Sequence, residues 1–356
     1  MKDSQYAEVL LAWYDANKRA LPWRMDSRVG QVDVYRVWVS EIMLQQTTVE
    51  TVKGYYGRFI ERWQTVDALA SAERDEVLLF WQGLGYYRRA HGLHEAARKV
   101  VAEHKGVFPR DDASLRALPG IGAYTSAALR AIAFGEAVLP LDGNIKRILA
   151  RLLALNKPVE REGRTLEAFG QRLVPRQRSG DFAQAMMDLG ATICLPRQPR
   201  CGICPYQKGC LAYRKNKASA YPYRAPKKER PHRYAVFFWI ENEHGAYWLE
   251  KRPEKGLLAG LMICPSTPWR DKAWGKNDWR AYGDKKQQWQ MVEGHIVHVF
   301  THFTLHATIA YGRSKDRRPT SKATEGVWVS HGKEKDYALS TLMRKVIAHK
   351  YKQGAP

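Results

Sequence analysis

Apolar residues recur at helical spacing through most of the chain up to Ala212. Near the N-terminus, for example, Val9, Leu10 and Trp13 follow this spacing, which is typical of an amphipathic helix. The connections between such segments are short and contain Gly or Pro. Many short helices with tight connections predict a compact all-α domain. The predicted helices lie near 6–19, 34–48, 49–62, 74–81, 88–104, 113–117, 123–134, 144–155, 165–174 and 181–194.

After residue 233 the pattern changes to that of strands. Residues 235–240 and 247–250 are β-prone and are separated by a turn at 242–245, and 296–307 form a long β-prone run. Residues 265–290 mix Trp with charged residues, and their pattern assigns them to no element. We therefore expect a multidomain chain in which a smaller α+β domain follows the helical one.

Between the two patterns, residues 214–233 offer few apolar side chains for burial. They contain eight Lys or Arg, one acid and three prolines, a composition typical of a solvated linker. Such a segment either lies along a phosphate backbone or serves as a tether without contacts. The predicted organisation is a helical domain at 1–213, a basic linker at 214–233 and an α+β domain at 234–356.

The charge of the chain indicates the kind of partner. The formal net charge is +22, and 45% of the 356 residues are hydrophobic, which is enough for packed cores and excludes disorder over the whole length. Such a charge favours a polyanionic partner: nucleic acid first, an anionic membrane surface second. No apolar run approaches the ~20 residues of a membrane span, and no signal peptide is recognisable. We expect an intracellular protein in a reducing compartment.

Four of the five cysteines, Cys194, Cys201, Cys204 and Cys210, lie within one short segment. In a reducing compartment this spacing indicates a metal site rather than disulfides. Tetrahedral zinc and a [4Fe–4S] cluster both use four thiolates, and ligand softness alone does not separate them. Four unrelated buried cysteines are the alternative. Cys264 stands apart and is expected in the core of the second domain.

Two glycines mark a hairpin between predicted helices. Gly120 and Gly122 follow Leu118-Pro119 and precede a helix. Glycines allow a tight turn that directs backbone N–H groups outward at a helix N-terminus, which is a site for phosphate. Any helix–turn–helix could use such glycines, but the basic character of the chain strengthens the phosphate interpretation.

Two acidic residues are candidates for chemistry. Asp142 opens a predicted helix, so its simplest role is that of an N-cap. Glu41 lies in the apolar stretch 37–44, where a carboxyl group is either a paired core residue or an acid with a raised pKa. One protonated and one ionised carboxyl group are the arrangement that cleaves a glycosidic bond through an oxocarbenium-like state.

At this point the motifs resemble a known family. The chain is similar to the MutY family of adenine DNA glycosylases, in the helix-hairpin-helix superfamily that includes endonuclease III. The resemblance covers nearly all of 1–212, and it implies that the four cysteines hold a [4Fe–4S] cluster. The matching segments are Leu21–Arg24, Trp38–Thr47, Gly83–Tyr87, Leu118–Thr125, Leu141–Arg147, Met186–Ala191 and the four-cysteine segment.

The resemblance also implies roles for individual residues. Glu41 would protonate adenine at N7, Asp142 would stabilise the oxocarbenium sugar, and Tyr124 and Asn144 would position the sugar and the acid. Bifunctional members of the superfamily carry a lysine where this chain has Tyr124, so we expect a monofunctional glycosylase. The DNA- and substrate-binding residues implied by the resemblance are Arg24, Gln46, Tyr86, Gly120, Gly122 and Gln184. Among them, Gln46 and Tyr86 match family residues that insert into the base stack; the alternative for Tyr86 is a core tyrosine.

The second half resembles the Nudix-like domain of the same family. Lys251–Leu261 carries the resemblance, and Phe300-Thr301-His302 corresponds to a Phe-Ser-His loop that contacts 8-oxoguanine. Thr301 keeps the hydroxyl group of the family serine. The alternative for His302 is a histidine that simply faces solvent from a β-strand. The glutamate-rich signature of Nudix hydrolases is missing, so the domain is expected to recognise a base rather than hydrolyse nucleotides.

Together these features predict a monomeric base-excision enzyme of the cytoplasm and nucleoid. It would remove adenine opposite 8-oxoguanine, or opposite guanine, in double-stranded DNA. Three alternatives remain at this point. They are a bifunctional glycosylase and lyase similar to endonuclease III, a DNA-binding module without catalysis, and a nucleotide hydrolase in the second half.

Overall fold

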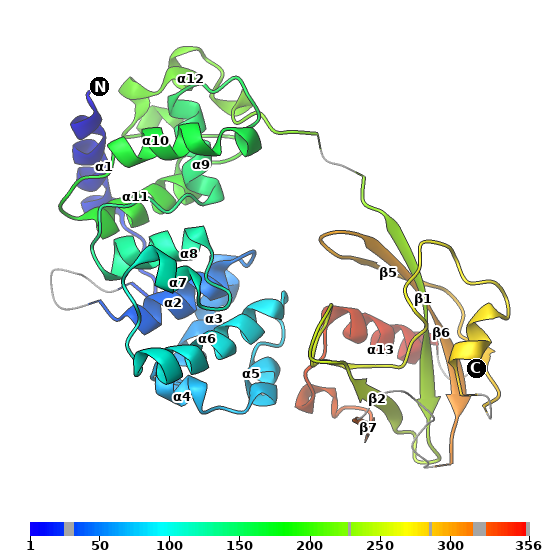
Figure 1. The fold of residues 1–356 in the computed structure, drawn as a ribbon. Helices are drawn as coiled ribbons and strands as arrows, with labels where there is room; N and C mark the ends of the chain where they lie inside the picture. Colours follow the sequence, from blue (N-terminus) through cyan, green and yellow to red (C-terminus); the bar gives the residue numbers. More distant parts are fainter. Residues whose placement is uncertain (25–31, 227–228, 285–286, 316–324, 354–356) are drawn as a thin grey trace. The chain divides into compact units, whose positions relative to one another are not determined.

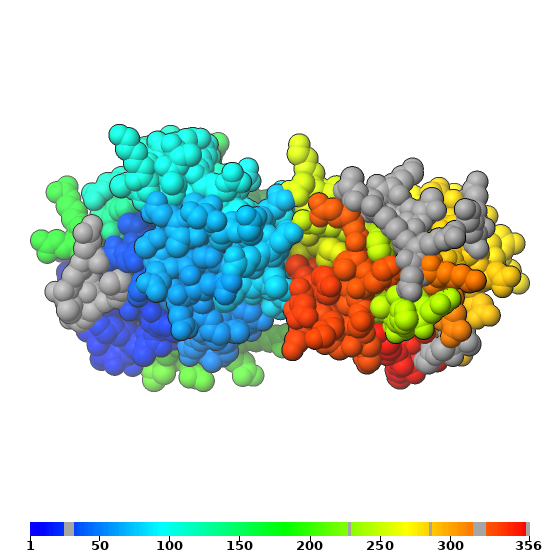
Figure 2. Space-filling view, turned by 90° about the horizontal axis from the view of Figure 1, so that it is seen from below, coloured from blue at the N-terminus to red at the C-terminus, as the bar shows by residue number. Residues whose placement is uncertain are grey.

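The computed structural model describes the chain except residues 25–31, 227–228, 285–286, 316–324 and 354–356. The chain forms two compact units, which are drawn as a ribbon in Figure 1 and as a surface in Figure 2. The first contains residues 1–71 and 92–227, and the second contains 72–91 and 228–356. None of the described helices is long and apolar enough to cross a membrane.

The first unit is helical, as the pattern predicts. A π-helical turn, Leu129–Ala133, continues α8, and short 3₁₀ turns occur at Val159–Arg161, Cys201–Ile203, Gln207–Gly209 and Ala218–Ala220. Helix α6 (Arg88–His104) begins in the second unit and continues into the first. The other helices are α1 (Asp3–Asn17), α2 (Val34–Leu44), α3 (Val49–Arg62), α4 (Val66–Ala70), α7 (Asp112–Arg116), α8 (Ala123–Ala128), α9 (Gly143–Leu152), α10 (Gly163–Arg172), α11 (Ser179–Thr192) and α12 (Leu211–Arg214).

One core of this unit lies where α1, α9 and α11 pack together (Figure 1). Leu10 of α1, Leu149 of α9 and Phe182 of α11 are all fully buried there. Apolar residues at helical spacing on α9 face this core, which fixes the rotation of the helix. The N-terminus of α9, with Asp142 as its N-cap, is thereby held in one place.

The predicted glycine hairpin joins α7 to α8. Gly120 has a φ of 78°, in the left-handed region that glycine adopts without strain. A Cβ atom added to Gly92 of α6 would lie only 3.2 Å from the Cα of Gly120. The two backbones therefore approach closely, and Gly122 is left exposed as the N-cap of α8.

In its described residues, the second unit is built on a seven-stranded mixed sheet in the order β3-β2-β1-β6-β4, with β7 also paired to β2 and β5 to β6. β1 and β6 run parallel over ten residue pairs, and the other pairs are antiparallel. The elements are α5 (Arg74–Phe80), β1 (His232–Glu241), β2 (Tyr247–Lys251), β3 (Met262–Ile263), a 3₁₀ turn (Asp278–Tyr282), β4 (Gln290–Met291), β5 (Ile296–Val299), β6 (Thr304–Arg313), β7 (Gly326–Val329), a 3₁₀ turn (Glu334–Asp336) and α13 (Thr341–Gln353).

Both faces of this sheet are covered. On one face, Phe237 of β1 belongs to a core that includes Cys264 and residues of α13. On the other face, Phe238 packs against Trp279 and Trp289. Trp279 and Trp289, from the stretch that the sequence pattern left unassigned, thus cover the second face of the sheet, while Cys264 is a core residue as predicted.

The β-prone run 296–307 is not one strand. β5 ends at Val299, β6 begins at Thr304, and the two pair antiparallel. The backbone N–H of Phe300 donates to the carbonyl of Phe303, which closes the turn between them. Propensity alone missed this turn because no Gly, Pro or Asn marks it.

The second unit includes residues 72–91, which come from within the otherwise helical part of the sequence. The Tyr87 hydroxyl donates to the carbonyl of Leu339 (3.0 Å), and the Gln82 amide donates to that of Tyr337 (3.1 Å). Lys251 forms an ion pair with Asp75 at 2.6 Å. These contacts join segments that lie far apart in the sequence, which periodicity cannot reveal.

Part of the predicted linker contacts the first unit. The carbonyl of Tyr221 accepts from Arg151 Nε, and the backbone N–H of Ala225 donates to Glu160. From His232 onward the chain is in β1. Residues Tyr221 and Ala225 of the predicted linker therefore contact the first unit, and His232 and Arg233 belong to β1, while Lys227 and Lys228 lie outside the described residues.

Candidate active site

Glu41 lies on the buried helix α2. Asp33 caps this helix, since its carboxylate accepts from the backbone N–H groups of Tyr35 (2.9 Å) and Arg36 (3.3 Å). Glu41 is only 5% exposed. Burial raises its pKa to about 7, since water no longer solvates the ionised form.

Tyr124 and Asp142 face Glu41 from two other helices. The Tyr124 hydroxyl of α8 donates to Glu41 Oε2 at 2.8 Å, which favours the carboxylate. The negative charge of Asp142 opposes this effect and, together with burial, accounts for the pKa of about 7. The fold therefore brings together three residues predicted as catalytic, although they are widely separated in the sequence.

Asp142 is an N-cap and also a member of this group. Its Oδ1 accepts from the backbone N–H of Ile145 at 2.6 Å, and its Oδ2 accepts from the Asn144 amide at 2.9 Å. Burial raises the pKa of Asp142, while these two donors lower it. Asp142 is thus both the cap of α9 and one of the acidic residues predicted to be catalytic.

Asn144 is held in turn by Arg147, whose guanidinium donates to Asn144 Oδ1 and to the carbonyl of Gly190, each at 2.8 Å. A Cβ atom at Gly190 would lie 2.5 Å from the Cβ of Asn144. Only glycine fits there, because the two helices touch at this point. This contact fixes the amide that orients Asp142.

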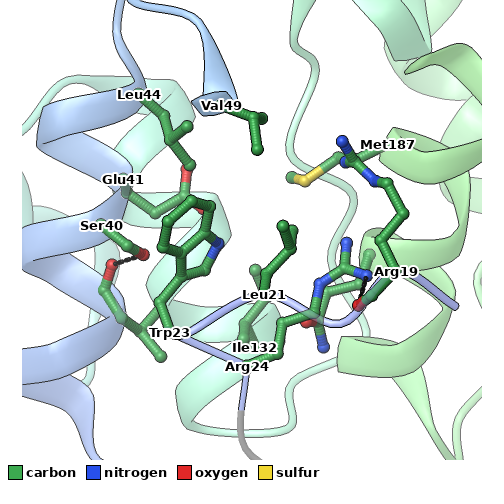
Figure 3. Close-up of a pocket in the computed structure, with 12 residues that line it drawn as sticks. Arg19, Leu21, Trp23, Arg24, Ser40, Glu41, Leu44, Val49, Ile132 and Met187 are labelled. Atoms are coloured by element: carbon green, nitrogen blue, oxygen red, sulfur yellow. Dashed lines mark hydrogen bonds between the residues drawn. The ribbon is translucent and has the colours of Figure 1, made fainter. Parts of the chain in front are cut away.

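A narrow pocket opens beside Glu41 (Figure 3). Its volume is about 50 Å³, well below the ~300–1,000 Å³ that is usual for ligand sites. Apolar side chains make up most of its wall, with Glu41 and two arginines as the charged members. The lining residues are Arg19, Leu21, Trp23, Arg24, Val37, Ser40, Glu41, Leu44, Val49, Ile132, Gln184 and Met187.

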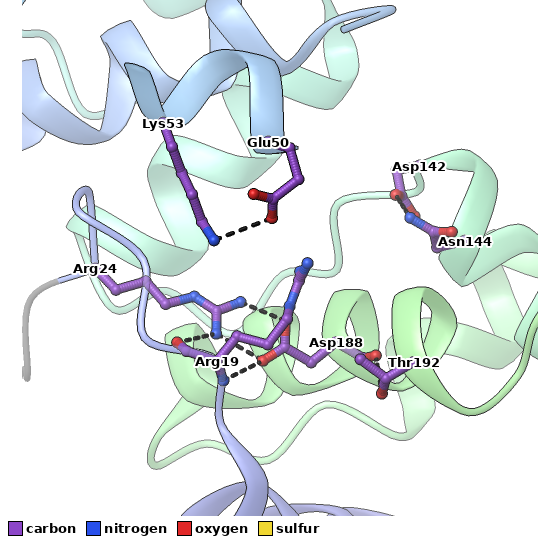
Figure 4. Close-up of polar contacts among 8 residues, drawn as sticks. All are labelled: Arg19, Arg24, Glu50, Lys53, Asp142, Asn144, Asp188 and Thr192. Carbon is purple, nitrogen blue, oxygen red and sulfur yellow. Dashed lines mark hydrogen bonds and ion pairs between the residues drawn. The ribbon is translucent and has the colours of Figure 1, made fainter. Parts of the chain in front are cut away.

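Arg24 and Arg19 share one carboxylate on the side of this pocket (Figure 4). Arg24 Nη1 and Nη2 donate to Asp188 at 2.6 and 2.7 Å, and Arg19 Nε donates to it at 2.6 Å. Arg24 and Gln184, both predicted to bind substrate, line the same pocket as Glu41.

Gln46 and Tyr86, the predicted stack-inserting residues, share an uncommon backbone conformation. Their φ angles are 59° and 46°, in the left-handed region that costs energy for residues other than glycine. Tyr86 is 51% exposed, so the alternative that it is a core tyrosine is wrong. The two residues belong to different units.

The four clustered cysteines follow the end of α11, around two 3₁₀ turns. Burial, with smaller contributions from the nearby sulfurs of Cys194, Cys210 and Cys201, raises the pKa of Cys204 to about 12. Four thiolates this close repel each other unless a cation lies between them, so the donor set suits a thiophilic metal group. Within the described ranges, however, no set of three or more Cys, His, Asp or Glu is placed to hold a metal ion.

Phe300, Thr301 and His302 lie on the turn between β5 and β6. The Phe300 ring packs against Phe303 and Trp269, with centroids 4.8 and 5.7 Å apart, and is half-buried. Thr301 and His302 are exposed. His302 is therefore exposed, as a solvent-facing histidine would be, but it lies on a turn and not within a strand.

Comparisons with known proteins identify the family. Residues 39–173 match the family model of the HhH-GPD superfamily of base excision DNA repair proteins, and residues 236–349 match that of the NUDIX domain. The adenine DNA glycosylase of Mus musculus is 36% identical over 395 residues, which cover 95% of this chain and 76% of the relative. The chain belongs to the adenine DNA glycosylase family.

Solved structures agree with the fold. A thermostable thymine-DNA glycosylase is 30% identical, with a TM-score of 0.54, and covers 60% of this chain and 97% of its own. Endonuclease III in a non-covalent complex with DNA, at 19% identity and a TM-score of 0.50, shares the fold over 61% of this chain and 98% of its own. The chain is thus a base-excision DNA glycosylase with an endonuclease III-like helical part and a Nudix-like part, and DNA is its substrate.

Three residues at or beside the pocket were not predicted as site residues, although two of them lie within segments that carry the family resemblance. Arg19 and Trp23 precede the predicted Arg24, and Asp188 lies one helical turn after Gln184 on α11. The signal for Asp188 was an acid at i+4 from a predicted pocket residue, on the apolar face of a helix. Its arginine partners lie near the other end of this unit's sequence and could not be inferred from spacing.

Proposed function

We propose that this glycosylase removes adenine mispaired with 8-oxoguanine, or with guanine, and does so without cutting the strand. The observation that carries the proposal is the buried group of Glu41, Tyr124 and Asp142 beside a pocket. Glu41 has a pKa of about 7, so at neutral pH a large fraction of it carries the proton that a general acid must donate.

Adenine inside a duplex is out of reach of this group, so it has to flip out of the stack, at a cost of a few kcal/mol. The pocket encloses only about 50 Å³. Side chains on its wall therefore have to shift before a purine can enter. Gln184 on the wall offers an amide to the edge of the base, while Gln46 and Tyr86 fill the space that the base leaves.

Glu41 then protonates adenine at N7 and makes it a better leaving group. The sugar develops positive charge as the bond breaks, and the ionised Asp142 stabilises it. Asn144 and the N-terminus of α9 keep Asp142 in place with two hydrogen bonds. Water then adds to the sugar cation at C1′ and releases a proton, which gives an abasic site. Tyr124 cannot form an imine with the sugar as a lysine would, so the strand stays intact.

The residues that would hold a [4Fe–4S] cluster are Cys194, Cys201, Cys204 and Cys210. When bound, the cluster would supply a structural cross-link of the loop. The fully buried Arg151 already ties this loop to α9, with donors to Cys194 Sγ (3.1 Å) and to the carbonyls of Leu195 and Pro196. Exposed basic residues of such a loop, together with Gly120 and Gly122 of the hairpin, suit contacts with DNA phosphates.

Recognition of the opposite base belongs, in this proposal, to Thr301 and His302. An oxidised guanine offers a new N–H donor at N7 and an oxygen at C8, and a hydroxyl group with an imidazole matches both. Phe300 anchors the turn by packing inward. In this proposal the two exposed side chains can contact the opposite base without a change in the conformation of the turn.

The test is single-turnover incubation with a duplex that contains one adenine opposite 8-oxoguanine, followed by alkali. We expect strand cleavage only after alkali, at a faster rate than with guanine opposite, and none with a normal A·T pair. Borohydride during the reaction should trap no enzyme on DNA. Trapped enzyme would support the lyase alternative, and no cleavage at all would overturn the adenine assignment.

A further inference from the structure

Asp188 is a fully buried carboxylate that forms ion pairs with two guanidinium groups. Its side chain has no exposed surface, and it accepts from Arg24 through two nitrogens and from Arg19 through Nε and the backbone N–H. Figure 4 shows both arginines converging on it from the segment before α2. Two distant regions of the sequence are joined at this single carboxylate.

The same two arginines line the pocket beside Glu41 (Figure 3). The positive charge of Arg24 lowers the pKa of Glu41 and thereby opposes the effect of burial. Since the field of a charge depends on where it is held, the protonation of Glu41 depends on the position of Arg24.

The charges of this group do not cancel completely. Two guanidinium groups and one carboxylate leave a net charge of +1 in a largely buried place. Without the carboxylate this becomes +2, and the Arg24 side chain loses the two hydrogen bonds that fix its direction. The loss of the carboxylate charge makes the potential at Glu41 more positive.

We propose that Asp188 is a positioning residue for base removal, which holds Arg24 and Arg19 on the pocket wall and balances their charge opposite Glu41. This inference rests on the proposed role of Glu41 as the general acid. Asp188 itself does not line the pocket, so it acts through the arginines and not on the base.

The other groups that face Glu41 come from separate elements and stay unchanged in the test. They are Tyr124 of α8, which donates to the carboxyl group, and Asp142 at the start of α9, whose charge raises its pKa. In the described part of the chain, Tyr124, Asp142 and Arg24 are the groups whose charge or hydrogen bond influences the pKa of Glu41.

The experiment measures single-turnover adenine excision between pH 5 and 9 for the full-length protein and its Asp188→Asn variant. Each profile is normalised to its own acidic plateau, so that a general loss of activity cancels. We expect the alkaline limb of Asp188→Asn to move to lower pH by about one unit, since added positive charge favours the ionised Glu41. At pH 7 the normalised rate should then fall about fivefold.

Three further variants test whether charge is the cause. Asp188→Glu keeps the charge and should keep the limb in place, although its rate is lower. Arg24→Gln removes the cation and should move the limb to higher pH. Combining Asp188→Asn with Arg24→Gln should bring the limb back toward that of the unmodified protein.

The matched control is Asp15→Asn, which breaks another Asp–Arg pair of the same unit, with Arg178 at 2.6 Å. Neither of these residues lines the pocket of Glu41, and the control should leave the limb unmoved. If Asp188→Asn does not fold, the shift of Arg24→Gln and the unmoved limb of Asp188→Glu decide the matter.

An unmoved limb in folded Asp188→Asn, or in Arg24→Gln, would overturn the inference. A failure of the proposed function has a different signature. In that case the profile of the unmodified protein has no limb near pH 7, and Glu41→Gln retains its activity.

Discussion

Glu41 and the pair Thr301–His302 are assigned to the two sides of one mispair, yet their surroundings are opposite. Glu41 is buried among helices, and three groups from three segments of the chain influence the pKa of its carboxyl group. Thr301 and His302 are exposed on a turn that one buried ring anchors. The first region modifies the chemistry of its residue by removing water, whereas the second only displays ordinary hydrogen-bonding groups.

This difference predicts the size of mutational effects. A group whose pKa is shifted by burial supports the chemical step itself, which is worth orders of magnitude. A group that adds one hydrogen bond at a wet surface contributes only about 0.5–1.5 kcal/mol. Substitutions in the two regions should therefore differ in magnitude and also in which rate they change.

The largest effect is expected from Glu41→Gln. The amide keeps the shape of the side chain but has no acidic proton, so adenine release should fall by roughly 10²–10⁴-fold. Binding of mispaired DNA, measured by a mobility shift, should be preserved. A folded variant that releases adenine at a near-normal rate would remove the contrast between the two regions.

The same substitution should stabilise the protein at alkaline pH. The pKa of Glu41 is about 7 in the folded protein against an ordinary 4.5, so its contribution to stability is complete below pH 4.5 and is lost as pH rises through 7. The loss is roughly 3 kcal/mol. Thermal unfolding at pH 5 and pH 8 should show that Glu41→Gln gains over the unmodified protein only at pH 8. An equal difference at both pH values would contradict the burial of an ionisable group there.

The smallest effect is expected from Thr301→Ala and His302→Ala. Each should lower the preference for 8-oxoguanine over guanine by roughly two- to tenfold, which is the value of one hydrogen bond. The adenine release step itself should be little changed on the guanine duplex. Single-turnover rates on duplexes that differ only in the opposite base provide the measurement. The exposed Tyr282, on another segment of the same unit, serves as a control when replaced by Phe. If discrimination survives both alanine substitutions, the turn does not recognise the lesion.

Sequence patterns predicted the helical half well because its signals are local. The periodicity that places α2 and α9 also places Glu41 within the first and Asp142 at the start of the second. The pairing of Asp188 with Arg19 and Arg24 could not be predicted, since it depends on how α11 packs against a segment near the N-terminus.

The sheet unit was predicted less completely, for the same reason. Trp279 and Trp289 lie in a segment without regular periodicity. Their position becomes clear only from their packing against the second face of β1. The turn at Phe300–Phe303 interrupts a run of β-prone residues, because the pairing of β5 with β6 outweighs the propensity of these residues to extend. Helix α13 also went unpredicted, although it covers the first face of the sheet.

The composition of the second unit from residues 72–91 and 228–356 limits how parts of this enzyme can be exchanged with relatives. A chimera joined at the linker takes the sheet from one parent and the helix α5 from the other. Leu339 and Tyr337 then face side chains that did not evolve with them, at the positions of Tyr87 and Gln82. A chimera that keeps these contacts needs two further crossovers, one on each side of residues 72–91. The second unit is thus compact in space, although its two segments are separated in the sequence.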